Sequence, residues 1–96
     1  MRRAARVDTN HSAVVKAFRE CGCTIEDLSG VGGGCPDIVI GLRGESVFVE
    51  IKDGKRKPSE QKLTPAQAIW HRDWKGSKAI VRSPEEARAL VERIGA

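Results

Sequence analysis

The chain has 96 residues, of which 40% are hydrophobic and 31% are charged, which predicts one globular domain over residues 1–96. Its net charge of +4 is a mild basic excess that favours a polyanionic partner. No apolar run approaches the roughly 18 residues that span a bilayer, and no apolar stretch follows Met1-Arg2-Arg3, so we expect no membrane span, no signal peptide and a cytoplasmic protein.

The N-terminal part of the chain predicts a helix from about Thr9 or Asn10 to Cys21. Asp8 and the two residues after it can all cap a helix N-terminus, and Gly22 is a natural residue just beyond a helix end. Four apolar residues recur at helical spacing and should form one buried stripe: Val14, Ala17, Phe18 and Cys21.

A short strand is predicted over Cys23–Leu28, and a glycine-rich loop follows it. Four of the six residues of Ser29–Gly34 are glycines, which open the region of positive φ. The loop lacks the Gly-Lys-Ser/Thr ending of a P-loop, so no nucleotide cofactor is expected. It could serve as a mobile connector, or bring its backbone close to a ligand.

Two β-rich runs, Asp37–Leu42 and Ser46–Lys52, are joined by a turn that contains glycine and predict a hairpin. A hairpin brings Asp37, at the start of one strand, next to Glu50, near the end of the other. Glu50 and Lys52 share one face of their strand, because strand side chains repeat every second residue. Two carboxylates beside a lysine can hold a hard cation such as Mg²⁺ or Mn²⁺. The alternative is a solvated charge pair.

The second half of the chain predicts one more strand and two helices. A polar, basic connection, Asp53–Lys62, precedes a helix that should begin after Thr64 and end near Gly76. Thr64 and Gln67 fit a capping box. A strand over Lys78–Arg82 and a helix from Ser83 to about Ile94 complete the chain. The residues expected on the apolar side of the middle helix are Ala68, Ile69, Trp70 and Trp74.

The predicted order of elements is α, β, β, β, α, β, α. This order suits an α/β fold with a mixed sheet of about four strands and helices packed on its faces.

Three short motifs in this order resemble one nuclease family. Gly34-Cys35-Pro36-Asp37, Glu50-Ile51-Lys52-Asp53-Gly54 and Leu63-Thr64-Pro65-x-Gln67 resemble the PD-(D/E)xK nuclease superfamily. Within it they are most similar to the small stand-alone VRR-NUC proteins of phages and bacteria. The resemblance covers about residues 7–87 and implies a restriction-endonuclease-like core with the metal site on the central strand pair.

The resemblance implies a role for each candidate residue. Asp37 and Glu50, with the carbonyl of Ile51, would hold Mg²⁺, for which Mn²⁺ would substitute, and Lys52 would orient the attacking water. Gln67 would lie close to the lysine, although the capping box competes for the same side chain. Asn10 stands where many relatives have an acidic residue that reaches the metal, and a neutral amide would be a weaker ligand.

The same resemblance implies DNA as the partner. The residues expected to contact its backbone are Gly33, Gly34, Lys55, Arg56, Lys57 and Lys62, with a solvated loop as the alternative for the four cations. Trp70 and Trp74 are i, i+4 neighbours that we expect in a core or a dimer interface, with base stacking as the alternative.

The three cysteines, Cys21, Cys23 and Cys35, are expected to be reduced thiols. Their spacing matches no common zinc module, even with His11 or His71 as a fourth ligand.

We therefore expect a divalent-metal-dependent DNA endonuclease in a bacterial cell or phage-infected host. The resemblance implies a homodimer that cuts branched DNA such as four-way junctions in replication, repair or recombination. The rival hypotheses are a DNA-binding module that has lost the chemistry and a subunit that needs a protein partner.

Overall fold

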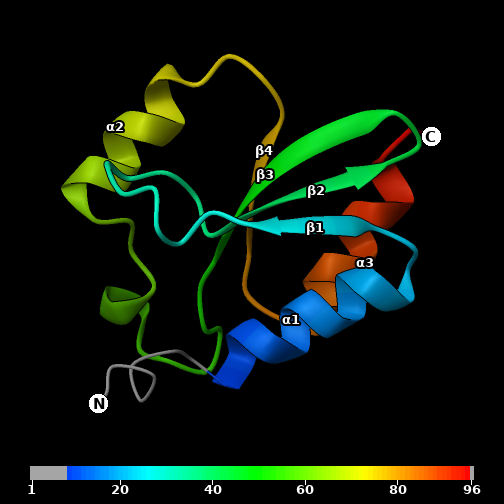
Figure 1. The fold of residues 1–96 in the computed structure, drawn as a ribbon. Coiled ribbons are helices and arrows are strands. Elements are labelled where there is room, and N and C mark those ends of the chain that lie inside the picture. The colour runs from blue at the N-terminus through cyan, green and yellow to red at the C-terminus, as the bar shows by residue number, and fades with distance from the viewer. Residues whose placement is uncertain (1–8, 96) are drawn as a thin grey trace.

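The computed structural model describes residues 9–95, so the candidate cap Asp8 lies outside the described residues. Its elements follow the predicted order, with one short 3-10 turn added, η2 (Figure 1). They are α1 (Thr9–Glu20), β1 (Thr24–Asp27), β2 (Ile38–Leu42), β3 (Glu45–Ile51), η2 (Pro58–Glu60), α2 (Pro65–Asp73), β4 (Lys78–Val81) and α3 (Pro84–Arg93).

The four strands form one mixed sheet in the order β1-β2-β3-β4. The first three are antiparallel neighbours, and β4 runs parallel to β3 after the crossover through α2. Ile38 lies opposite Val49, so the start of β2 is beside the end of β3, as the hairpin prediction required. Ile51 lies beside Val81, which brings the end of β4 to the same edge.

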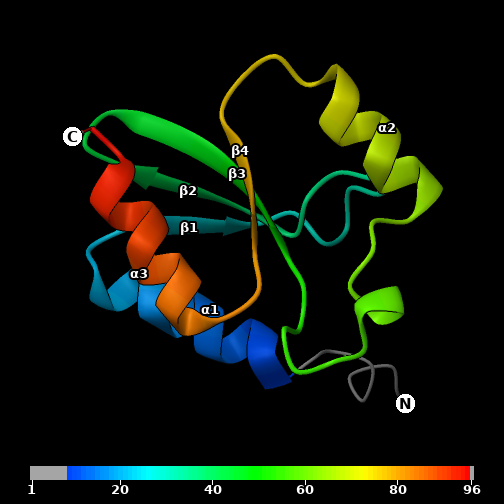
Figure 2. The same ribbon diagram turned by 180° about the vertical axis from the view of Figure 1, so that it is seen from behind.

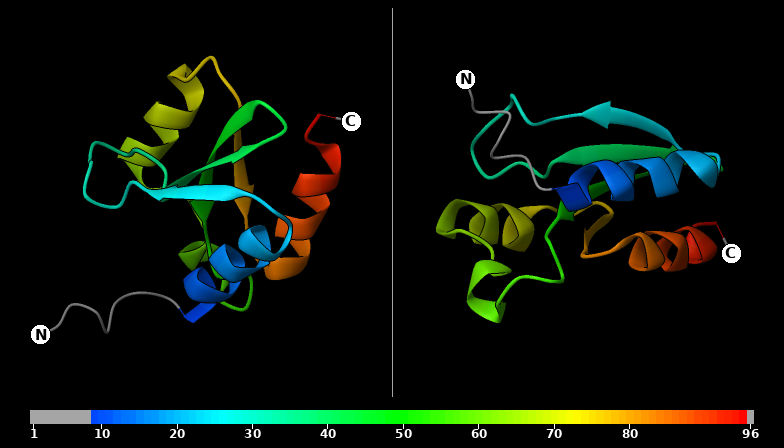
Figure 3. Two further views of the ribbon diagram at one scale, coloured as in Figure 1. Left: turned by 45° about the vertical axis from the view of Figure 1, so that its right-hand side comes forward. Right: turned by 90° about the horizontal axis from the view of Figure 1, so that it is seen from below.

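One face of the sheet packs on α1 and α3, which lie side by side beneath it (Figures 2 and 3). Side chains on β3 alternate, so Val47, Val49 and Ile51 point into this core while Phe48 and Glu50 point to the other face. The remaining members of the core are Val14, Ala17, Phe18, Cys23, Ile38, Ile40, Val81, Ala87, Leu90, Val91 and Ile94.

The β2–β3 turn anchors the end of α3. Arg43 adopts a positive φ of 51° in this turn, and its guanidinium donates to the carbonyls of Val91 (3.4 Å) and Ile94 (3.0 Å). The Val91 carbonyl also accepts from the backbone amide of Ile94 (3.1 Å), whereas the Ile94 carbonyl lies just beyond the last helical residue, where a helix end needs outside donors. The turn between β2 and β3 therefore caps the C-terminal helix.

The helix α2 stands apart from α1 and α3 on the other side of the sheet (Figure 3), and none of its residues is buried. It begins with the predicted capping box but ends at Asp73, three residues before Gly76, because Trp74 is already extended (φ −70°, ψ 124°). The ammonium of Lys78 bonds to the carbonyls of His71 and Trp74 at this end.

The expected apolar side of α2 was partly wrong. Ile69 is 52% exposed and Ala68 is exposed, because helical spacing places Gln67, Trp70 and Trp74 on the side that faces the sheet. Trp70 is half-buried and Trp74 remains exposed, so neither belongs to the core cluster.

The glycine-rich loop touches the first turn of α2. Gly34 has φ of 83°, and a Cβ built there would lie 2.3 Å from the carbonyl oxygen of Ala66. Gly33 also has a positive φ (66°) but would meet nothing within 4 Å. The absence of a side chain at Gly34 therefore lets the loop pack against α2.

We predict that Gly34→Ala destabilises the protein more than Gly33→Ala. Both variants put a side chain at positive φ, but only the first also collides with helix backbone, an overpacking cost of about 1–3 kcal/mol. For a chain of this size that corresponds to a melting temperature lower by roughly 5 °C or more, measured by circular dichroism. Equal losses for the two variants would show that Gly34 does not hold α2 in place.

Candidate active site

Asp37 lies just before β2 and binds the end of β3. Its Oδ2 accepts a hydrogen bond of 2.7 Å from the backbone amide of Ile51. The amide of Lys52 donates in the opposite direction, to the Val81 carbonyl on β4 (3.0 Å). Because the peptide is trans, the Ile51 carbonyl points away from β4, toward the side of Asp37. The three expected ligands, Asp37, Glu50 and the Ile51 carbonyl, therefore lie at one end of the β2–β3 pair.

Glu50 is the one charged residue in the buried set, with 2% of its surface exposed. Its Oε2 accepts a hydrogen bond of 3.1 Å from Gln67 Nε2 and lies 3.7 Å from Lys52 Nζ. Its Oε1 is also buried and has no hydrogen-bond partner among the described residues. A buried carboxylate oxygen without a donor is costly, unless a group that the protein does not itself supply satisfies it.

Burial, the neighbouring Asp37 charge and a hydrogen bond with Asp37 together raise the pKa of Glu50 to about 8. Lys52 acts in the opposite direction and lowers the pKa, but does not offset the first three effects. Two carboxylates that share a buried site resist ionising together, whereas a cation between them would favour the ionised form of both.

Gln67 joins the catalytic candidates to α2. Its Oε1 accepts from Lys52 Nζ (3.0 Å) and also from the backbone amide of Thr64 (2.9 Å), while its Nε2 donates to Glu50. The capping box and the site contact, which we expected to compete for this side chain, are formed together. One amide thus fixes the helix start and orients both Glu50 and Lys52.

Asn10 contacts the backbone of two strands. Its Nδ2 donates to the carbonyls of Lys52 (2.7 Å) and Arg82 (3.2 Å), just beyond the ends of β3 and β4. Arg82 was not among the residues expected at the site. Its position one residue after β4 was the available signal that its backbone lies near the ends of the strands. The amide of Asn10 therefore holds two strand ends beside Glu50 and Lys52.

The basic connection after β3 is folded by its own polar side chains. Gln61 Nε2 donates to the carbonyls of Gly54 (3.3 Å) and Arg56 (2.7 Å), and its Oε1 accepts from Arg82 Nε (3.1 Å). Arg56 lies within 4 Å of carboxylates of Asp53 and Glu60. Three other cations of this connection are exposed: Lys55, Lys57 and Lys62.

The donor set fits a hard cation. Among residues 9–95 no group of three or more histidine, cysteine or acidic side chains is placed to hold a metal. A cation here would have two carboxylates, one backbone carbonyl and water as ligands, which suits Mg²⁺ because it keeps several waters. The unpartnered Glu50 Oε1 is the observation that supports this fit. The three cysteines are free thiols, and burial together with Glu50 and Asp37 raises the pKa of Cys35.

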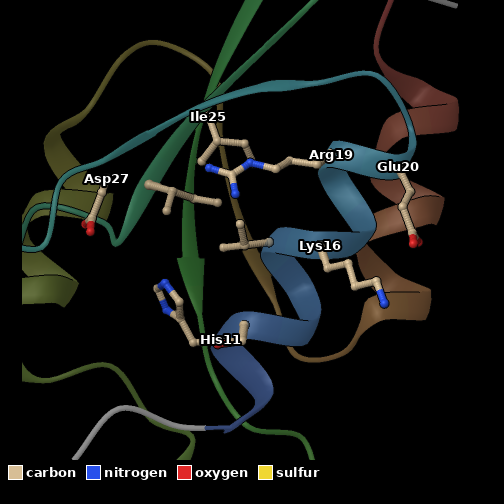
Figure 4. A pocket seen from close by; sticks show the side chains of 9 residues that line it. His11, Lys16, Arg19, Glu20, Ile25 and Asp27 are labelled. Atoms are coloured by element: carbon tan, nitrogen blue, oxygen red, sulfur yellow. The ribbon is translucent and has the colours of Figure 1, made fainter. Parts of the chain in front are cut away.

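A separate groove of about 550 Å³ lies between α1 and the edge strand β1 (Figure 4). Val15, Ile25 and Ile38 give it an apolar lining, and Lys16 and Arg19 lie along the helix side. Neither Asp37 nor Glu50 lines it, so this groove is distinct from the carboxylate pair.

Comparison with known proteins places this geometry in a family. No protein-family model matches the sequence, and no curated protein matches it significantly. A solved structure described as "VRR_NUC domain" matches with a TM-score of 0.61 and 26% sequence identity, over 88% of this chain and 91% of that one. The chain has the fold of a VRR-NUC domain.

The match identifies a nuclease-type fold, in agreement with the α/β sheet and helices described above. No helix in the described part of this VRR-NUC domain is long and apolar enough to cross a membrane.

We predict that Glu50→Gln stabilises the metal-free protein, and more so as pH rises. A carboxyl group with a raised folded pKa keeps its proton in the folded state while the unfolded state loses it, so stability falls between pH 4.5 and about 8. In EDTA the variant should match the wild type near pH 5 and melt at least about 5 °C higher at pH 9.

The control for Glu50→Gln is Glu85→Gln, which removes an exposed carboxylate. If both variants shifted the melting temperature equally at pH 9, burial of the Glu50 charge would not be the cause.

We predict that Asn10→Asp is no better tolerated than Asn10→Ala. A carboxylate cannot donate to the Lys52 and Arg82 carbonyls, so both variants should lose roughly 1–3 kcal/mol of stability, measured by urea unfolding in EDTA. A metal ligand at this position would behave differently. If Asn10→Asp tightened Mn²⁺ binding in a calorimetric titration, residue 10 would reach the cation.

Proposed function

We propose that this VRR-NUC domain protein is a divalent-metal-dependent endonuclease that hydrolyses phosphodiester bonds in DNA. The observation that carries the proposal is the buried Glu50 carboxylate, whose Oε1 lacks a partner while Asp37, Lys52 and Gln67 surround the group. A site built only for stability would satisfy or remove such an atom, since an unsatisfied buried oxygen costs about 1–3 kcal/mol.

The roles of the carboxylates follow from their chemistry. Asp37, Glu50 and the Ile51 carbonyl would hold Mg²⁺ or Mn²⁺. When bound, the cation neutralises charge on the scissile phosphate and lowers the pKa of coordinated water. Asp37 also holds the Ile51 amide, so one side chain would position two of the three ligand groups.

The side chain of Lys52 is fixed in a position from which it can act on a water molecule. Its side chain is only 14% exposed, and Gln67 and Glu50 fix the ammonium on the same face as the carboxylates. From there it can orient a water whose oxygen attacks phosphorus. A new P–O bond forms as the attacking water gives up a proton to solvent, and the bond to the leaving sugar oxygen breaks as that oxygen takes a proton from solvent. The fixed positive charge also stabilises the extra negative charge on the phosphate during attack.

The basic connection gives a path for DNA away from the site. Lys55, Lys57 and Lys62 are exposed on the segment that leaves β3 directly after Lys52. Cations that contact phosphates supply affinity without reading sequence. The described domain offers no spare helix for the major groove, so we propose selection by DNA structure, with branched substrates such as four-way junctions and a homodimeric enzyme. Its proposed setting is the cytoplasm of a bacterium or phage-infected host, in replication, repair or recombination.

We predict that the pure protein cuts DNA only with Mg²⁺ or Mn²⁺. The assay uses labelled linear, flap and four-way-junction substrates, with EDTA as the metal-free condition. Asp37→Asn should lower the rate at least about 100-fold, because it removes a ligand charge while keeping the shape of the side chain. Glu92→Gln, an exposed carboxylate on α3, is the matched control and should cut normally.

Binding of DNA without cutting of any substrate would overturn the proposal and favour a module that lacks the chemistry. Sedimentation of the protein, free and with a junction, measures whether it acts as a dimer.

A further inference from the structure

A row of aromatic side chains lies beside the proposed active site. We call Phe48, Trp70 and Trp74 the aromatic row. The two indoles are nearly parallel, with ring centroids 5.0 Å apart and an angle of 12°. Phe48 packs against them with centroids at 5.4 Å from Trp70 and 4.7 Å from Trp74. Trp74 is nevertheless 38% exposed, so the row ends in an indole that nothing in the described chain fully covers.

The aromatic row continues from the active site along both elements that build it. On β3, Phe48 is two residues before Glu50, so both side chains stand on the same face of the sheet, about 7 Å apart along the strand. On α2, Trp70 and Trp74 follow Gln67 at i+3 and i+7, on the same side of the helix. Trp74 is thus about 10 Å along the helix from Gln67, which donates to Glu50.

The charges around Trp74 suit a phosphate backbone. The ammonium of Lys78 donates to the backbone carbonyl of Trp74, which places a positive charge at the end of α2 where this residue stands. Lys75 is exposed next to it in sequence. Between residues 65 and 84 the only acidic side chain is Asp73, and Arg72 neutralises it at 2.7 Å. The segment that carries the two indoles is therefore net positive.

The size of the exposed surface favours a base over a second protein. The large apolar residues exposed in the described chain are Val31, Ile69 and Trp74. Ile69 is five residues before Trp74, about 140° around the helix axis, and does not extend the row. A stable dimer buries about 800 Å² on each partner around an apolar centre, whereas the row offers one indole face.

We propose that the exposed part of the Trp74 indole, backed by Trp70, stacks on one unpaired base of the DNA strand whose phosphate lies at Asp37 and Glu50. This inference rests on the proposed nuclease function and adds the feature that it selects. In an intact duplex every base is already stacked on its neighbours. Trp74 can stack only where the strand is unpaired, as at a flap, a fork or a junction centre, within one or two nucleotides of the cut.

Intrinsic fluorescence tests the inference directly, because the chain has two tryptophans and no tyrosine, so its indole emission comes from the row alone. The metal-free protein in EDTA is titrated with single-stranded oligothymidylate and with a blunt duplex of equal length. We expect strong quenching with the single strand and little with the duplex. Trp74→Ala should weaken single-strand binding roughly tenfold, measured by anisotropy of labelled DNA, and Trp74→Phe should weaken it less.

Ile69→Ala, an exposed apolar residue on another side of α2, is the control and should bind like the wild type. Circular dichroism checks that each variant is folded, and Trp74→Phe keeps a ring in place if Trp74→Ala is not. Equal quenching by single strand and duplex, or unchanged binding by both Trp74 variants, would overturn the inference. So would an emission shift that depends on protein concentration without DNA, since that would assign the row to a contact between copies.

The stacking proposal and the nuclease proposal can fail separately. If single-stranded DNA quenched the fluorescence but no substrate were cut, the stacking proposal would stand and the nuclease proposal would fall. If Trp74→Ala cut DNA with the wild-type rate, metal dependence and substrate preference, the nuclease proposal would stand and the stacking proposal would fall.

Discussion

The arrangement of this domain depends on one buried carboxylate. Glu50 lies near the end of the inner strand β3, on the face away from the hydrophobic core, and is too deeply buried for water to solvate its charge. Each polar neighbour is placed in relation to it: Asp37 from the paired strand, Lys52 from the same strand and Gln67 from α2. The arrangement tolerates a partnerless oxygen and a raised pKa, which a structure selected only for stability would avoid.

One face of the sheet packs in the hydrophobic core, and the opposite face carries the candidate site. Val47, Val49 and Ile51 bury one side of β3 against α1 and α3, while Phe48 and Glu50 present the other side to α2. Because α2 has no buried residue, it is held by polar bonds through Gln67, by aromatic contacts and by the close approach of Gly34. The element that completes the site is thus the one attached least firmly to the core.

The sequence predicted the parts of the site that depend on local geometry. A hairpin needs only short-range signals, and it was sufficient to bring Asp37 to Glu50 and to put Lys52 on the same face. The three helices and four strands were also predicted in the right order, with ends shifted by a few residues. Side-chain contacts could not be predicted where one side chain binds two partners at once, or where the partners are far apart in the sequence. Nothing local shows that the Gln67 amide can cap its helix and bind Lys52 together, or that Asn10 meets the ends of two strands.

The hydrogen bond from Asn10 to Arg82 joins residues 72 positions apart, and its companion to Lys52 spans 42. Such bonds form only after the intervening chain has closed into its final topology, since closing a long loop costs entropy that late contacts recover. The hairpin with Asp37 and Glu50 can form early, but the strand ends beside it are aligned last. A nascent or partly folded chain would therefore carry the acidic pair without the finished site, and under the proposed function cutting of DNA would begin only when folding is complete.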